Sequence, residues 1–407
     1  MSLGRTYAKL WAASAFANLA DGVFQVALPL LAVQLTRSPL LIAGVTLAAR
    51  LPWLLMSLVA GALADRLDRR QMMVRVNLAR TVLLGGLALA VATGVATLPL
   101  VYAVALLLGV AETLFDTSAQ SLLPAVVGRD DLSRANSRLY AVELVANMFV
   151  GPPLGGLLAA LALAAALAVP AAAYLAGAAC LALIAGSFRP ARQGPPTRLR
   201  DDIAEGVRFI WRHPVLRPLA FMLGVQNLAA TAWYSVLVLF AVAPGPMGLS
   251  QAGFGTLLAS LGVGALLGTW LAVPVERRLG RVRTLALSVV LGGGALLVPV
   301  VTTDAVAVGV SLAVGGLQMV LWNVVTVSLR QRISPDHLLG RVNAGYRLVG
   351  WGTMPLGALL GGLVAETLGM RVVFALAAGA VLVLLVGFRF VTEAVIERTE
   401  AAAAPTR

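Results

Sequence analysis

The chain has 407 residues, of which 59% are hydrophobic and 12% charged, with a net charge of +13 and one cysteine. This composition excludes a soluble globular protein, which carries roughly 25% charged residues, a disordered chain and a disulfide-stabilised domain. The charge does not indicate a nucleic-acid partner either, because the basic residues recur in short clusters between apolar stretches, as in a multi-pass membrane protein.

Twelve segments of about 20 mostly apolar residues are long enough to cross a bilayer as helices. The first is too long for a cleaved signal peptide and carries Asp21, so we expect it to remain in the protein. The predicted fold class is therefore an all-α integral membrane protein. The predicted spans are residues 10–35, 39–63, 72–94, 98–122, 138–164, 168–188, 215–242, 250–275, 284–301, 305–329, 341–365 and 371–390.

The basic residues lie almost entirely on one side of these spans. If the spans alternate in direction, only Arg37 and Arg371 fall in connections on the opposite side, while Arg50 and Arg80 fall inside spans. Basic loops stay in the cytoplasm. We therefore expect a bacterial cytoplasmic membrane protein with both termini cytoplasmic.

The longest connection divides the chain into six spans and six. We expect an N-terminal bundle (1–188), a linker (189–214), a C-terminal bundle (215–392) and a cytoplasmic tail (393–407), disordered from residue 397. Within the linker, Ile203, Val207 and Ile210 recur at helical spacing among charged residues. This pattern predicts a short amphipathic helix on the inner membrane surface.

The two halves are also related in sequence. At an offset of 207, Arg134-x-Asn136 matches Arg341-x-Asn343, and Gly151-Pro-Pro-Leu-Gly155 resembles Met354-Pro-Leu-Gly357 at a slightly smaller offset. Parallel repeats of this kind predict two six-helix bundles related by a pseudo-two-fold axis along the membrane normal, with a cavity at their interface.

The loop after the second span resembles the signature loop of the major facilitator superfamily. It reads Gly61-Ala-Leu-Ala-Asp65-Arg66-Leu-Asp68-Arg69-Arg70. Asp68 replaces the usual glycine, as in the drug and siderophore exporter branch that includes macrolide-efflux and enterobactin-export proteins. The resemblance implies a major facilitator fold and a gating role for this loop; the alternative is a basic turn that only sets orientation. The predicted gating residues are Gly61, Asp65, Arg66, Arg69 and Arg70.

The fifth span contains Gly151-Pro152-Pro153-Leu154-Gly155-Gly156, which resembles the antiporter motif of the same family. The residues assigned to it are Gly151, Pro152, Gly155 and Gly156, and the alternative is helix packing alone. Two departures matter. The stretch 105–109 lacks the arginine usual in span 4, so the family's proton relay does not carry over to this chain. The second-half loop, Arg277-Arg-Leu-Gly280-Arg281, lacks the acid found in the loop 61–70.

Several charged side chains are predicted at membrane depth, where each costs at least about 2.5–3.5 kcal/mol. Asp21 and Arg50 fall at similar depth and are expected to form an ion pair. Glu112 has no obvious basic partner at its depth, although Arg80 in the third span could reach a neighbouring helix. Glu112 and Asp116 share one helix face. The alternative to proton transfer is a static network. The predicted proton-coupling residues are Asp21, Arg50, Glu112, Asp116 and Glu143.

Amide and aromatic side chains beside apolar walls suit a bulky, partly apolar ligand. The alternative is ordinary hydrogen bonding between helices. The predicted cavity residues are Gln25, Gln226, Asn227, Trp233, Tyr234, Gln318, Trp322 and Asn323. No spacing indicates a metal site, a cofactor or a nucleophile with its base, so we expect no enzyme.

These patterns predict a proton-coupled secondary exporter of amphipathic drugs or related molecules. Its expected partners are a small-molecule substrate, protons and the lipid bilayer, and we expect a monomer. One alternative is a dedicated exporter of a single solute such as a siderophore or lysolipid. Another is a membrane scaffold or sensor that transports nothing, against which the short loops argue.

Overall fold

The computed structural model describes residues 3–64, 67–128, 131–186, 188 and 199–403. Within these ranges twelve helical segments are long and apolar enough to cross a membrane. The predicted all-α fold class and the twelve predicted spans are confirmed.

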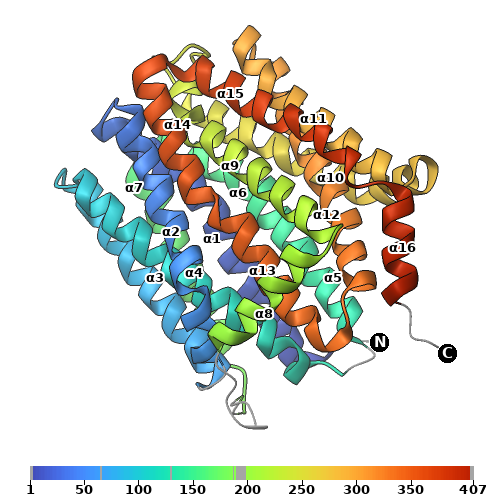
Figure 1. Ribbon diagram of the computed structural model, residues 1–407. Helices are drawn as coiled ribbons and strands as arrows, with labels where there is room; N and C mark the ends of the chain where they lie inside the picture. Colours follow the sequence, from blue (N-terminus) through green and yellow to red (C-terminus); the bar gives the residue numbers. More distant parts are fainter. Residues whose placement is uncertain (1–2, 65–66, 129–130, 187, 189–198, 404–407) are drawn as a thin grey trace. The chain divides into compact units, whose positions relative to one another are not determined.

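The described helices, labelled in Figure 1, are assigned to two compact units. The first contains residues 238–262 and α1 (Gly4–Leu35), α2 (Pro39–Ala64), α3 (Arg69–Ala92), α4 (Leu98–Val126), α5 (Leu132–Val142), the π-helical η2 (Glu143–Val150), α6 (Gly151–Leu161) and α7 (Leu163–Ala182). The second contains the described residues 199–237 and 263–403. Its helices are α8 (Leu199–Arg212), most of α9 (Leu216–Ala241), most of α10 (Gln251–Leu279), α11 (Arg281–Val301), α12 (Ala305–Ile333), α13 (Asp336–Gly352), α14 (Met354–Leu368), α15 (Met370–Val383), the 3-10 helix η3 (Leu384–Arg389) and α16 (Glu393–Ala403).

In the first unit, α7 packs against both α1 and α3, and α4 packs against α2 and α3. Small and aliphatic residues form these contacts; Ala13, Ala17 and Ala20 of α1 are buried, as is Ala171 of α7. Alanine lets helix backbones approach closely in a membrane. This packing places side chains of α1, α3 and α7 at a common junction.

In both units a helix is interrupted where the repeated motif that contains proline begins. In the first unit α6 begins at Gly151 with proline in its first turn, and in the second unit α14 begins at Met354 in the same way. Proline lacks a backbone N–H and is tolerated there, whereas inside a helix it breaks a hydrogen bond. The repeated motif therefore has the same structural effect in both halves.

The amphipathic linker helix is present as α8, but its packing differs from the expectation. Ile210, predicted to face the membrane surface, is fully buried. It lies against α13, where a Cβ added to Gly345 would be 3.1 Å from its Cδ1. Glu205 forms an ion pair with Arg341 of α13. A lipid-facing orientation was wrong for this residue because a protein helix covers the apolar side. Linker residues 189–198 lie outside the described residues.

His213 lies between α8 and α9. Its Nδ1 accepts hydrogen bonds from the backbone N–H groups of Val215 and Leu216, both at 3.2 Å. Burial lowers the pKa of His213, which favours the neutral imidazole that can accept these bonds. The histidine thus caps the start of α9.

The expectation that the chain is disordered from residue 397 was wrong. α16 continues to Ala403, and Ile396 on it is fully buried. Two of its glutamates, Glu393 and Glu400, bond to other elements of the second unit. Residues 404–407 lie outside the described residues.

Candidate functional site

A cluster of ionisable side chains lies at the junction of α1, α7 and α3. The Tyr174 hydroxyl donates a hydrogen bond to Oδ1 of Asp21. The Arg80 guanidinium lies 3.9 Å from the same oxygen. Arg80 and Tyr174 are almost completely buried, whereas 26% of the Asp21 side chain is exposed. Of these three side chains, Asp21 is the one that remains accessible.

The expected ion pair between Asp21 and Arg50 was wrong, because among the described residues the cation paired with Asp21 is Arg80. The reason is that α1 and α3 both pack against α7, which brings Arg80 to Asp21. Arg50 is exposed on α2 and acts on Asp21 only through its more distant charge.

Two aromatic rings hold the Arg80 guanidinium. Its central carbon lies 4.9 Å from the ring centre of Tyr174 and 5.2 Å from that of Phe115 on α4. Its Nε has no hydrogen-bond partner among the described residues. A guanidinium held by ring faces and one ion pair is bound less tightly than one in a bidentate carboxylate pair.

Glu112 and Asp116 on α4 flank Phe115, and both interact electrostatically with Arg80. They are partly exposed. The charge of Arg80 therefore acts on Glu112, for which the sequence indicated no obvious basic partner. Glu143 is exposed at the start of η2 and acts on Asp116 from there. Arg80 is consequently shared by acids from α1 and α4.

Sequence reasoning missed Tyr174 and Phe115, and considered Arg80 only as a possible partner of Glu112. Aromatic residues in a membrane span give no signal that separates a ligand of a charge from ordinary packing. Arg80 did give a signal, since an arginine deep in a span needs a partner.

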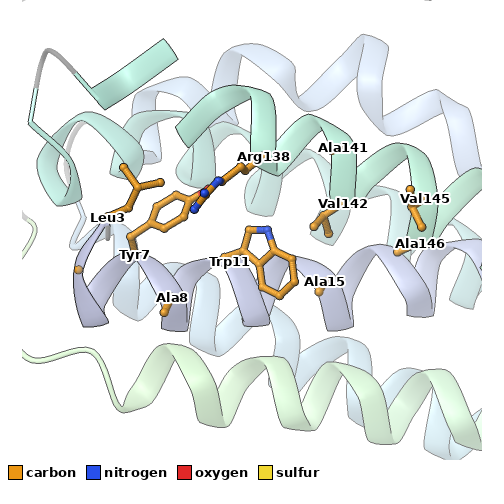
Figure 2. Close-up of a pocket in the computed structure, with 11 residues that line it drawn as sticks. Leu3, Tyr7, Ala8, Trp11, Ala15, Arg138, Ala141, Val142, Val145 and Ala146 are labelled. Carbon is orange, nitrogen blue, oxygen red and sulfur yellow. The ribbon is translucent and has the colours of Figure 1, made fainter. Parts of the chain in front are cut away.

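The first unit also contains an apolar groove of about 780 Å³. Figure 2 shows it between the first turns of α1 and the α5–η2 segment. Trp11 is 40% exposed, and the side chains of Tyr7 and Arg138 point toward one another at one end. The Tyr7 hydroxyl donates to the carbonyl of Ala135 at 3.0 Å. None of these residues was predicted as part of a binding site.

Gln25, a predicted cavity residue, bonds instead within the first unit. Its Nε2 donates to the backbone oxygen of Asn147 at 2.9 Å and to the Asn147 side-chain oxygen at 3.3 Å. These bonds tie α1 to η2 and favour the alternative of hydrogen bonding between helices.

Two predicted cavity residues of the second unit pack inside it. Trp233 is buried, its ring centre lies 5.5 Å from that of Phe374 with the two rings tilted, and its Nε1 donates to the Leu296 carbonyl at 3.2 Å. Asn227 donates to the carbonyl of Gly350 at 2.8 Å. Both contacts favour a packing role over ligand binding.

The other predicted residues of the second unit differ in burial. Gln226 and Trp322 are buried, and their side-chain nitrogens have no hydrogen-bond partner among the described residues. The side-chain oxygen Oε1 of Gln318 likewise has no hydrogen-bond partner among the described residues. Tyr234 is partly exposed and Asn323 is exposed. These side chains remain candidates for substrate contact.

Asp68 organises the signature loop. Its Oδ1 accepts from the backbone N–H of Gln71 at 3.0 Å and caps α3, and its Oδ2 accepts from the N–H of Phe188 at 2.7 Å. Arg70 donates to the carbonyl of Ile184. The loop is thereby tied to the end of the sixth span. Among the predicted gating residues, Gly61 lies in α2 and Arg69 begins α3, whereas Asp65 and Arg66 lie outside the described residues.

The glycines of the predicted antiporter motif lie at close helix contacts. A Cβ on Gly151 would lie 2.6 Å from Cα of Gly22 on α1, and one on Gly155 would lie 2.7 Å from the carbonyl oxygen of Val23. A Cβ on Gly156 would lie 2.9 Å from Cα of Gly255. Pro152, in the first turn of α6, is buried. The motif brings α6 into contact with α1 near Asp21.

Replacing Gly155 by valine should destabilise this contact. The added side chain meets backbone, and overpacking typically costs about 1–3 kcal/mol. We expect a midpoint of thermal unfolding several degrees lower for the detergent-purified variant, measured by size-exclusion chromatography after heating. Gly86→Val is the matched control, because nothing lies within 4 Å of a Cβ at that helical glycine. Equal midpoints for the two variants would contradict the close contact.

The chain matches the family described as transmembrane secretion effectors over residues 3–407. It belongs to this family of major facilitator transporters. The transporter is 30% identical over 378 residues to the multidrug efflux pump Tap of Mycolicibacterium fortuitum, with 88% of each chain covered. It is 32% identical over 390 residues to Tap of Mycobacterium tuberculosis, covering 89% of this chain and 87% of the relative.

Solved structures share the fold. A nucleoside transporter matches with a TM-score of 0.79 at 14% identity, covering 95% of this chain and 99% of that one. A bacterial homologue of the iron transporter ferroportin, in an inward-facing state, matches with a TM-score of 0.75 at 17% identity, covering 98% and 100%. The predicted major facilitator fold and the drug-exporter resemblance are confirmed. The protein is a multi-pass membrane transporter that exports its substrates, and its family is one of transporters rather than enzymes.

Proposed function

We propose that this transporter is a proton-coupled antiporter that exports amphipathic molecules across the bacterial plasma membrane, with both termini in the cytoplasm. The observation that carries the proposal is the cluster of Asp21, Arg80 and Tyr174 with Glu112 and Asp116 on membrane-spanning helices. Charged residues at such positions are costly and typically functional.

The cluster offers a simple way to couple a proton to movement. Protonation neutralises Asp21 and removes its attraction for Arg80, while the acids of α4 keep theirs. The favourable position of the guanidinium then shifts from α1 toward Glu112 and Asp116. Proton binding thereby changes which helices the charge holds together, and a ligand that favours one state shifts the population toward it.

The groove along α1 supports an amphipathic substrate. Its volume lies within the range of about 300–1,000 Å³ typical of small-molecule sites. It offers the exposed ring of Trp11 to an apolar body and the exposed Arg138 guanidinium to a hydrogen-bond acceptor. Ala15 lines the groove, and Asp21 follows six residues later, about 9 Å along the same helix. A substrate in the groove would therefore contact the helix that carries the proton site.

The motif residues complete the proposal. The loop 61–70 acts as the gate through the bonds of Asp68 and Arg70, with Asp65 and Arg66 contributing as the family resemblance implies. The close contact of Gly151 and Gly155 with α1 would transmit movement of α1 to the fifth span.

Transport by the purified protein in liposomes tests the function. With the interior made acidic, so that protons flow outward, we expect uptake of an amphipathic dye such as ethidium above that of empty liposomes. A protonophore should abolish the uptake. Dye movement that ignores the pH gradient would contradict proton coupling. Saturable transport of one solute, with no dye movement, would favour the dedicated exporter instead.

A further inference from the structure

The α10–α11 loop of the second unit lacks a feature of its counterpart in the first. Asp68 is the residue before α3 and caps that helix through Gln71. Gly280 is the residue before α11 and has no side chain to do so. A helix whose first N–H groups have no acceptor is less stable at that end.

Glu393, at the start of α16, provides the missing acceptor. Its Oε1 accepts a hydrogen bond from the backbone N–H of Val282, in the first turn of α11, at 2.9 Å. A Cβ on Gly280 would lie 3.0 Å from the same oxygen. The carboxylate therefore occupies the space that a side chain at position 280 would need.

A second glutamate of α16 fixes the same region. Oε1 of Glu400 lies 2.9 Å from Nη1 of Arg281, the first residue of α11. The same oxygen lies 3.8 Å from Nη1 of Arg332, near the end of α12. α16 also packs against α12 (Figure 1). α16 therefore joins the beginning of α11 to the end of α12.

The first unit has an equivalent arrangement. Its loop is tied to the end of the sixth span by the bonds from Phe188 to Asp68 and from Arg70 to Ile184. α16 likewise follows the last span of the second unit. In each half, the segment after the final span holds the loop between the second and third spans.

We propose that Glu393 and Glu400 are positioning residues that supply, from the C-terminal helix, the acid that the second signature loop lacks, and that they hold α11 in place during the transport cycle. The part that concerns transport rests on the proposed function.

Alkylation of a buried thiol tests the positioning without a transport assay. Thr284 is fully buried near the start of α11. In a Cys180→Ala background, a Thr284→Cys variant reports how often this turn opens. Loss of a helix cap should raise the maleimide reaction rate about fivefold when Glu393→Ala is added. Glu393→Gln, whose amide oxygen still accepts, should react at nearly the unmodified rate. Exposed Glu397→Ala on the same helix is the control, and a Glu393→Ala rate equal to the control overturns the proposal.

Dye transport in liposomes tests the effect on the cycle. We expect Arg281→Glu and Glu400→Arg each to lower Vmax severalfold with KM unchanged, and the double variant to recover at least half of the loss. A merely structural role would lower the amount of folded protein and leave Vmax per folded molecule unaltered. If the wild type exports and the single variants match it, this inference fails. If the wild type exports nothing, the proposed function fails and the alkylation rates still decide the positioning.

Discussion

Asp21→Asn is expected to abolish uphill export while leaving exchange of substrate down its gradient. Asparagine keeps the shape of the side chain and can still accept the Tyr174 hydrogen bond, but it carries no exchangeable proton. A proton crossing a membrane potential of about 100 mV contributes about 2.3 kcal/mol, which corresponds to roughly 50-fold accumulation. That accumulation should fall to none in the variant.

Two assays on the same liposomes separate the outcomes. Accumulation of dye against a gradient measures coupling, and counterflow of labelled dye measures the conformational cycle alone. Asp304→Asn is the matched control, because Asp304 caps α12 by accepting from Ala307 at 2.8 Å and asparagine caps equally well. Uphill export by the Asp21→Asn protein would remove Asp21 from the mechanism.

The sequence was sufficient for the spans and the fold because both depend on patterns along the chain. Apolar runs of the right length mark membrane helices, and the proline motifs at Gly151 and Met354 mark interruptions that both units show. The family resemblance rested on residues close together in the chain, such as those of the loop 61–70, and the comparisons confirmed it.

The ion pair of Asp21 could not be predicted in the same way. The sequence gives the depth of a residue in the membrane, whereas a pair also depends on which helices are neighbours and on how each is rotated. Arg50 had the right depth, but α7 brings Arg80 to Asp21. The contacts of α16 could not be predicted for a related reason. In the sequence Glu393 and Glu400 resemble solvated charges, and only the fold places α11 beside them.

Arg80→Met is expected to be the most destabilising single change in the cluster. It keeps a long apolar stem between Phe115 and Tyr174 but leaves the acids of α1 and α4 without their shared cation. Removing one partner of a buried pair typically costs about 3–5 kcal/mol. Arg80→Lys should cost less, because it keeps the charge and loses only the flat contact with the rings.

A double-mutant cycle separates this charge effect from loss of packing. If Arg80 stabilises mainly by balancing Asp21, then Asp21→Asn should offset part of the damage, and the double variant should be more stable than the sum of the single changes by at least about 1 kcal/mol. Thermal unfolding of the purified variants measures this coupling. Strict additivity would mean that the rings and the α4 acids hold Arg80 without Asp21. The proton site would then have to be sought at Glu112 and Asp116. A double-mutant cycle of Arg80→Met with Glu112→Gln tests that site in the same way.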